Sequence, residues 1–276
     1  MTDERVVTVL GNLSVDHVDD GPPSPGGCPA FAGIALRSLG ASARIITRCA
    51  DADLPLFRGV LDAIPVPWDR LSADTTSSFA LRYRGDDRDM SVDAIGPVWH
   101  PSDVDAARVD SRWVHIAPLL RSDFPTETLE RLAADGCLVS FDGQGLVRAP
   151  RLGRLTLDAE FDPAVLASIQ VLKLADDEIQ ALTSGEFDVA AARRFAVPEI
   201  LVTHGSGGSD LYIDGVHTEV PATWRVSGVQ ATGAGDMFSV SYVAGRALGH
   251  EPDQAASDAA RFVAEQLELR RRTMSG

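Results

Sequence analysis

Short apolar runs alternate with amphipathic stretches along most of this chain. Runs of strand length, rich in β-branched residues, occur at 5–10, 43–47, 113–117, 138–141, 171–174 and 200–203. Helix-like patterns occupy 30–39, 126–134, 176–183 and 189–195. Strands that alternate with helices predict an α/β fold, with a mostly parallel central sheet flanked by helices.

The last part of the sequence contains two longer helical patterns. The first, 233–248, is apolar nearly all round, which predicts a central, buried helix. The second, 252–269, opens with Pro252, a residue favoured in the first turn of a helix.

One region lacks this alternation. Segments 77–83 and 90–94 have a strand pattern and are joined by Gly85-Asp86-Asp87-Arg88, which is typical of a hairpin turn. Together with 16–24, the hairpin could form a small β-flap. The alternative is a surface hairpin, although a lone hairpin is only marginally stable.

Composition narrows the class of protein. The chain has 276 residues and a formal net charge of −15, which disfavours a nucleic-acid-binding surface. The three cysteines, Cys28, Cys49 and Cys137, are too few and too scattered for a disulfide framework or a cysteine-rich metal site. With neither a signal-peptide pattern nor a membrane-length apolar stretch, a cytoplasmic protein is expected.

The basic residues are unusual because Lys173 is the only lysine. A phosphate-binding P-loop needs a lysine after its glycines, and none lies at such a position. If the protein transfers phosphoryl groups, it must hold phosphates mainly with backbone amides and arginine.

The segment Thr232-Gly233-Ala234-Gly235-Asp236-Met237 carries the strongest chemical signal. Its small residues allow a ligand to approach the backbone, and the N–H groups of Gly233, Ala234 and Gly235 could face an anion at the start of the helix. Asp236 would then be a base for a substrate hydroxyl. The alternative is a glycine turn in which Asp236 only caps the helix.

Residues 231–238 resemble the C-terminal signature of the ribokinase-like (PfkB) sugar kinases. Further segments resemble that family's motifs in the same order: 9–17, 26–27, 142–148, 173–178 and 203–208. The resemblance covers nearly the whole chain. It implies a single ribokinase-like kinase domain, 1–276, that uses ATP and Mg²⁺ to phosphorylate a hydroxyl of a small sugar or polyol. The segment from Asp142 to Arg148 resembles the branch that includes inositol kinases.

The resemblance also implies roles for single residues. Asp16 would accept hydrogen bonds from paired substrate hydroxyls, and Asn12, Gly26, Gly27, Gln144 and Arg148 would complete the acceptor site. The flap, at about 12–25 and 75–95, would form a lid and the contact of a homodimer. Asp16 could instead be an ordinary acidic turn residue.

On the donor side, the resemblance places Lys173, Thr203, Gly205 and Gly208 next to the nucleotide. It assigns Glu178 to Mg²⁺, which proteins often hold through water. The alternative for Glu178 is a solvated acid at a helix start, beside Asp176 and Asp177.

Three residues depart from the family pattern: Phe31, Ala175 and Gln230. Phe31 or Phe79 could stack on a base, which would favour a nucleoside kinase. The same departures would also suit a non-catalytic ligand-binding or regulatory protein on the kinase scaffold. The main hypothesis is an ATP-dependent kinase that acts on a neutral sugar or polyol, of which myo-inositol is one candidate. No nucleic-acid or membrane partner is expected.

Overall fold

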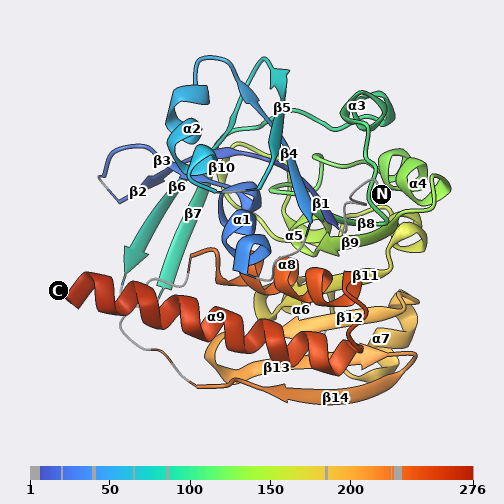
Figure 1. Cartoon of the computed structure of the whole chain (residues 1–276). Coiled ribbons are helices and arrows are strands. Elements are labelled where there is room, and N and C mark those ends of the chain that lie inside the picture. Colours follow the sequence, from blue (N-terminus) through green and yellow to red (C-terminus); the bar gives the residue numbers. More distant parts are fainter. Residues whose placement is uncertain are drawn as a thin grey trace.

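The computed structural model describes residues 7–19, 21–38, 42–64, 66–84, 87–183, 186–224, 226 and 232–275. Within these residues, nine strands form the central sheet (Figure 1). Their order is β14 (Val216–Pro221), β13 (Gly208–Ile213), β12 (Glu199–Thr203), β11 (Val171–Ala175), β9 (Leu138–Asp142), β8 (Trp113–Ala117), β1 (Val7–Asn12), β4 (Ala43–Ala50) and β5 (Trp68–Ala73).

Most of this sheet is parallel, as the alternating pattern predicts. The strands from β12 to β5 pair in parallel, and only β13 and β14 are antiparallel additions at one edge. Strand β1 lies between β4 and β8, so the direction of chain progression reverses there. Ligands of open α/β sheets bind at the carboxyl ends of the strands near such a point.

Two apolar cores cover the two faces of the sheet. One contains side chains of α1 (Cys28–Ser38), α8 (Ala234–Ala247) and α9 (Pro252–Ser275). The other contains side chains of α3 (Pro101–Ala107), α4 (Thr126–Ala134), α5 (Gln144–Val147), α6 (Asp176–Leu182) and α7 (Val189–Phe195). Helix α8 is buried along most of its length, which agrees with its nearly uniform apolar pattern.

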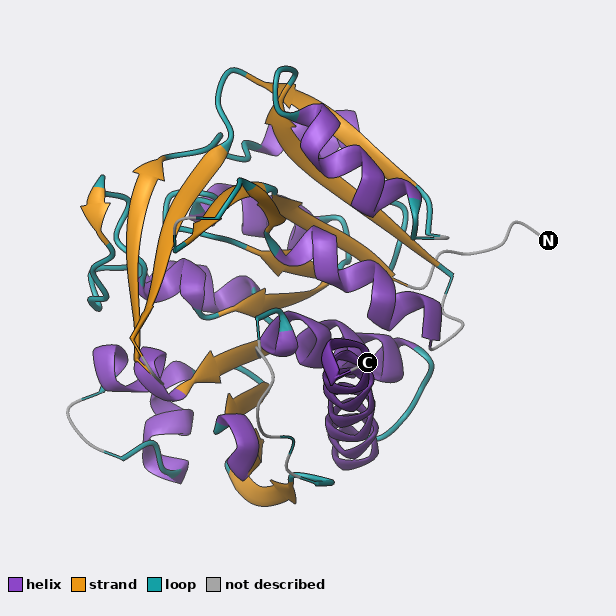
Figure 2. Cartoon of the chain, turned by 90° about the vertical axis from the view of Figure 1, so that its left-hand side faces the viewer, coloured by secondary structure: helices purple, strands orange, loops and turns teal. Residues whose placement is uncertain are grey.

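A second, mixed sheet forms the flap. In the described part of the chain its order is β10 (Gly153–Arg154), β7 (Asp87–Ala94), β6 (Ser77–Arg84), β2 (Ser14–Val18) and β3 (Ser24–Gly26). Figure 2 shows its long strands standing beside the body of the molecule. Phe79, Leu81 and Val92 pack against Leu119 and Leu120, so the flap has a small apolar core of its own.

The predicted elements recur with small shifts at their ends, and the α/β fold class is confirmed. The ranges 113–117, 126–134 and 189–195 coincide with β8, α4 and α7. The pattern missed α2 (Leu54–Asp62), α3, β5 and the β13–β14 hairpin. Residues 5–6, 39–40 and 85–86 of the predicted elements lie outside the described residues.

Candidate active site

A cavity of about 410 Å³ lies between the flap and the carboxyl ends of the parallel strands. Its floor comes from residues at or just after the ends of β8, β9 and β11, and its roof from β6 and β7 of the flap. The polar and glycine residues that line it are Ser14, Asp16, Gly27, Cys28, Tyr83, Gln144, Arg148, Lys173, Asp177, Glu178, Thr232, Gly233, Gly235 and Asp236.

Asp236 lies in the first turn of α8, beyond the helix cap. Gly233 occupies the cap position, and the first intrahelical bond runs from the Met237 N–H to the Gly233 carbonyl, at 2.9 Å. The N–H groups of the preceding residues therefore lack an intrahelical acceptor and can face an anion. This geometry does not match the alternative in which Asp236 is merely the cap.

The electrostatic surroundings of Asp236 suit a base. Burial raises the pKa of its carboxyl to about 6, and the neighbouring Asp142 adds to the rise, while Lys173 opposes it. A carboxylate with a pKa near 6 is largely ionised at neutral pH but takes up a proton more readily than an ordinary aspartate. The Cys28 thiol also contacts this carboxyl.

Lys173 is buried in an acidic cluster beneath the cavity. It is 5% exposed, and its Nζ lies 3.5 Å from Asp142 Oδ2 on the adjacent strand, with which it is in register. Burial by itself lowers the pKa of Lys173, but Asp142, Glu178 and Asp236 outweigh it and raise the pKa. Lys173 is therefore a permanent cation next to Gly235.

On the acceptor side, Asp16 extends from β2 into the cavity. Ser14 Oγ donates a hydrogen bond to Asp16 Oδ1, at 2.7 Å, which fixes the carboxylate. A side chain on Gly26 would collide with Asp16 Oδ2, so the glycine leaves the space that this carboxylate fills. Gly27, Gln144 and Arg148 line the same cavity.

Asn12 has a different environment from the one predicted for it. Its side chain is fully buried, donates to the Pro97 carbonyl at 2.8 Å and accepts from Trp99 Nε1 at 2.8 Å. It is not among the described residues that line the cavity. Its amide thus joins the end of β1 to the segment before α3.

The flap covers the first cavity with apolar side chains. Phe79, Leu81 and Met90 line the cavity, whereas Arg82 on β6 is exposed. Tyr83 also lines it, and its hydroxyl shares a 3.3 Å hydrogen bond with Thr232 Oγ1. That bond joins the flap to the loop that precedes Asp236.

Phe31 lines the cavity beneath Gly233. Gly233 has a φ of +78°, and a side chain there would meet the Phe31 ring. The Arg270 guanidinium lies over the Phe31 ring, with its central carbon 6.0 Å from the ring centre. The Phe31 ring therefore supports the start of α8, where the N–H groups of Gly233, Ala234 and Gly235 form what is here called the anion site.

Glu178 is buried and is not a solvated acid. It is 4% exposed, lines the cavity, and its Oε2 accepts a 2.9 Å hydrogen bond from the Ala175 N–H. Burial raises its pKa to about 7, although Lys173 opposes the rise. Among the described residues, no cluster of three metal-binding side chains is formed. Asp177 and Glu178 together fit a Mg²⁺ ion that keeps most of its water.

A second cavity, of about 200 Å³, lies on the other side of Gly235, which lines both. It is lined by three of the four residues predicted to lie next to the nucleotide, Thr203, Gly205 and Gly208, whereas the fourth, Lys173, lines only the first cavity. None of the described residues that line the second cavity is charged. Its apolar residues are Ala222, Trp224, Val226, Ala234, Phe238, Ala260, Val263, Ala264 and Leu267.

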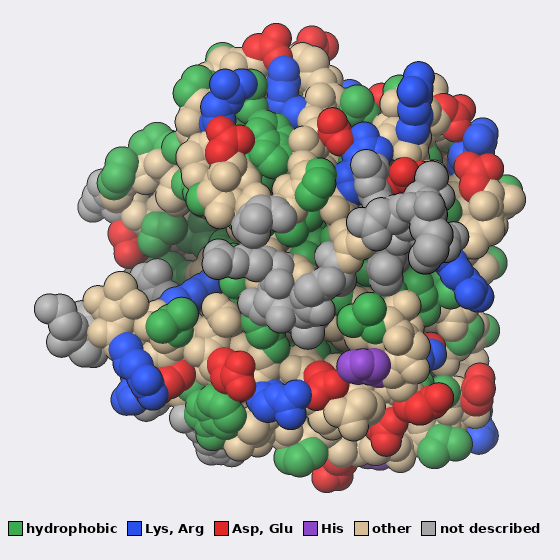
Figure 3. All heavy atoms as spheres, viewed as in Figure 1, with side chains coloured by type: hydrophobic (Ala, Val, Ile, Leu, Met, Phe, Trp, Pro, Cys, Tyr) green, Lys and Arg blue, Asp and Glu red, His purple; other side chains and the backbone are tan. Residues whose placement is uncertain are grey.

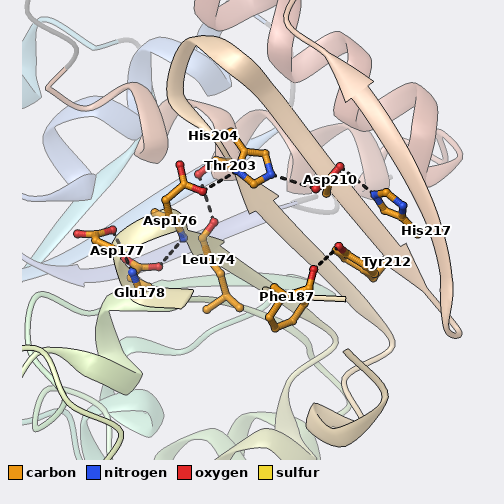
Figure 4. Close-up of polar contacts among 11 residues, drawn as sticks. Leu174, Asp176, Asp177, Glu178, Phe187, Thr203, His204, Asp210, Tyr212 and His217 are labelled. Atoms are coloured by element: carbon orange, nitrogen blue, oxygen red, sulfur yellow. Dashed lines mark hydrogen bonds and ion pairs between the residues drawn. The ribbon is translucent and has the colours of Figure 1, made fainter. Parts of the chain in front are cut away.

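The segment from Thr203 to Gly208, here called the donor loop, is tied to the start of α6 (Figure 4). Thr203 Oγ1 donates to the Leu174 carbonyl, at 3.2 Å. His204 lies between Asp176 and Asp210, with one ring nitrogen toward each carboxylate.

Sequence reasoning missed several lining residues. The first cavity, here called the acceptor cavity, is also lined by Cys28, Tyr83, Met90 and Leu119. Helix α9 supplies one wall of the second cavity. Only the apolar alternation of the flap strands could have indicated Tyr83 and Met90. Gln230 lies outside the described residues.

The remaining surface gives little functional information. On the face shown in Figure 3, acidic and basic side chains are interspersed. None of the described helices is long and apolar enough to cross a membrane.

Comparisons with known proteins agree with this geometry. The model of the pfkB family of carbohydrate kinases matches residues 105–269. A fructokinase of Klebsiella pneumoniae is 28% identical, with 91% of this chain and 87% of the relative covered. A pyrophosphate-dependent kinase of the ribokinase family, solved with a pyrophosphate analogue and myo-inositol, has a TM-score of 0.82 and 26% identity, with 95% of each chain covered.

A ribokinase from Arabidopsis thaliana, solved with ribose and ATP, shares the fold at a TM-score of 0.73 and 20% identity; the match covers 95% of this chain and 92% of that one. The anion site, the family match and the ribokinase fold lead to one conclusion: this chain belongs to the pfkB family of carbohydrate kinases.

Proposed function

We propose that this protein transfers the γ-phosphoryl group of ATP to a hydroxyl of a neutral polyol or sugar. The observation that carries the proposal is the position of Gly235, which lines both the acceptor cavity and the second cavity. An acceptor beside Asp236 and a nucleotide beside the donor loop would therefore meet at the first turn of α8.

The reaction follows from the groups at this junction. Asp236 takes the proton of the acceptor hydroxyl while that oxygen forms a bond to the γ-phosphorus. The bond between the γ-phosphorus and the bridging oxygen breaks, and ADP leaves with the electron pair. The N–H groups of Gly233, Ala234 and Gly235, with Lys173 behind them, stabilise the charge on the transferring group.

Asp177 and Glu178 would hold Mg²⁺ through water. When bound, the ion neutralises charge on the donor phosphates. Burial raises the pKa of Glu178 to about 7, and a cation nearby would favour its ionised form.

The second cavity favours ATP over pyrophosphate. Pyrophosphate consists only of charged phosphates, which call for cationic or polar partners, whereas the described lining is uncharged and largely apolar. A purine base fits such a lining, and we propose that it stacks on Trp224, which lines the cavity and is 42% exposed. The similarity to a pyrophosphate-dependent kinase makes pyrophosphate the second candidate donor.

The acceptor cavity favours a neutral ligand with adjacent hydroxyls. The Asp16 carboxylate can accept from two hydroxyls, and Gln144 offers both a donor and an acceptor. The relatives support two classes of acceptor, a ketohexose and a cyclic polyol. A nucleoside is the second candidate acceptor, because Phe31 and Phe79 both line the cavity and either ring could stack on a base.

One matrix of assays tests this function. Phosphate transfer is measured with ATP and with pyrophosphate, each in Mg²⁺, against myo-inositol, fructose, ribose, adenosine and fructose 6-phosphate. We expect turnover with ATP and the highest kcat/KM for a neutral polyol or sugar. Turnover with pyrophosphate but not with ATP would contradict ATP as the donor. A preference for the phosphorylated sugar would contradict a neutral acceptor.

A homodimer formed through the flap stays a prediction. The outward side chains Arg82 and Asp89 are exposed in the isolated chain. Analytical ultracentrifugation with and without an Arg82→Glu substitution would test whether this face is an interface.

A further inference from the structure

His204 lies between two carboxylates that come from different elements of the fold. Its Nδ1 lies 2.6 Å from Asp176 Oδ1 at the start of α6, and its Nε2 lies 3.0 Å from Asp210 Oδ2 on β13. A neutral imidazole has one donor and one acceptor nitrogen, so it can donate to only one of two carboxylates. Protonated His204 donates to both (Figure 4).

The surroundings of His204 support the protonated form. Burial lowers its pKa, but the hydrogen bonds to Asp176 and Asp210 outweigh burial and raise the pKa above the usual histidine value. Asp210 also faces His217 on β14, whose Nε2 lies 2.9 Å from Asp210 Oδ1. Across β13 and β14, Glu219 is opposite Asp210 in register.

The position of this cross-link gives it a role. The backbone N–H of His204 donates a 2.9 Å hydrogen bond to the Gly208 carbonyl, and this bond closes the donor loop. Gly205, Ser206 and Gly208 of that loop line the second cavity. On the other side, Asp176 immediately precedes Asp177 and Glu178, which line the first cavity. His204 itself lines neither.

We infer that protonated His204 is a positioning residue that holds the donor loop against α6 and thereby sets the affinity for the nucleotide. This inference rests on the proposed function, because it assumes that ATP occupies the second cavity. Deprotonation would release one of the two carboxylate contacts and loosen the loop, while Asp236 and the anion site stay unchanged. The effect should therefore appear in KM for ATP rather than in kcat.

The kinetic test compares His204→Gln, His204→Arg and His217→Gln with wild type between pH 6.5 and 9. In wild type, KM for ATP should rise with pH by roughly threefold to fivefold, a range expected of a half-buried ion pair. His204→Gln should have the high KM at every pH, and His204→Arg, which keeps a cation and two donors, should have the low one. His217→Gln is the matched control because it shares Asp210 but does not touch the loop.

A structural readout separates this inference from the proposed function. Amide hydrogen exchange of 203–208, compared with 126–134, should increase in His204→Gln whether or not the donor is ATP. Normal exchange in that variant would overturn the inference. ATP turnover with the same KM in wild type and His204→Gln would also overturn it while leaving the proposed function intact. Absence of ATP turnover in wild type would instead overturn the proposed donor and, with it, the role in nucleotide affinity.

Discussion

Arg270 donates a 2.8 Å hydrogen bond from Nη1 to the Thr232 carbonyl, so the last helix holds the loop that precedes the base. The guanidinium also lies over the Phe31 ring, and burial lowers its pKa. Among the described residues, no carboxylate forms an ion pair with Arg270. The contacts of Arg270 with Thr232 and Phe31 therefore support the anion site.

We therefore expect Arg270→Gln to lower kcat by roughly tenfold or more, because a hydrogen bond from a charged group typically contributes about 1.5–3 kcal/mol. KM for the acceptor should change little. Arg271→Gln is the matched control, since the Arg271 side chain is 51% exposed and pairs with Glu268. Equal kcat values for the two variants would show that Arg270 does not support the reaction.

Asp236→Asn should lower kcat by a factor of roughly 10²–10⁴, the usual contribution of a general base. The amide has nearly the same shape but cannot take the proton. Nucleotide binding, followed by titration calorimetry, should persist. A variant within a few-fold of wild-type turnover would leave Asp236 with no role as a base.

The pKa of Asp236 also sets a pH dependence for activity and stability. Because the carboxylate is the active form, kcat/KM should fall as pH drops below about 6. The folded-state pKa is raised above the ordinary value of 3.8, so the stabilising contribution is present below pH 3.8 and is lost as pH rises through about 6. Asp236→Asn should therefore raise the melting temperature at pH 8, measured by calorimetry. An unchanged melting temperature would contradict the raised pKa.

Gly26→Ala should displace the Asp16 carboxylate and raise KM for the acceptor, because the added methyl group would collide with Asp16 Oδ2. KM for ATP should stay near the wild-type value. Gly59→Ala is the control: it lies on α2, and a methyl group there meets no atom within 4 Å. Steady-state kinetics with each substrate varied in turn distinguish the two sites.

Ala264→Phe should fill the second cavity from α9 and raise KM for ATP by an order of magnitude or so, as expected when a base loses its pocket. Any turnover with pyrophosphate should be unaffected, because that donor does not reach this wall. If ATP kinetics are unchanged at preserved thermal stability, the cavity does not hold the base.

Except for β5, the parallel strands and α8 were predicted well, because continuous apolar runs of strand length and an all-round apolar helix are local signals. The β13–β14 hairpin was missed because β14 shows no alternation of buried and exposed residues: five of its six residues are exposed. Edge strands owe their structure to the neighbouring strand rather than to their own pattern.

Site residues differ in the same way. Asp236 directly follows Gly235, and Asp16 follows Gly11 at a spacing that resembles the family motif, so both residues could be assigned to the site from the sequence. The Asn12 amide could not be placed, because its partner Trp99 is distant in sequence and only the fold brings the two together. The small residues of α9 that line the second cavity, such as Ala260 and Ala264, have the same pattern as residues packed in a core.

The burial of Lys173 also governs how this protein reacts with amine-modifying reagents. Acylating reagents attack the neutral amine, and the only lysine is 5% exposed and has a raised pKa. The native chain thus presents no freely reactive lysine side chain to dyes, cross-linkers or lysine-directed immobilisation. Lysine labelling becomes a measure of unfolding, because modification at this single position requires the acidic cluster beneath the cavity to open.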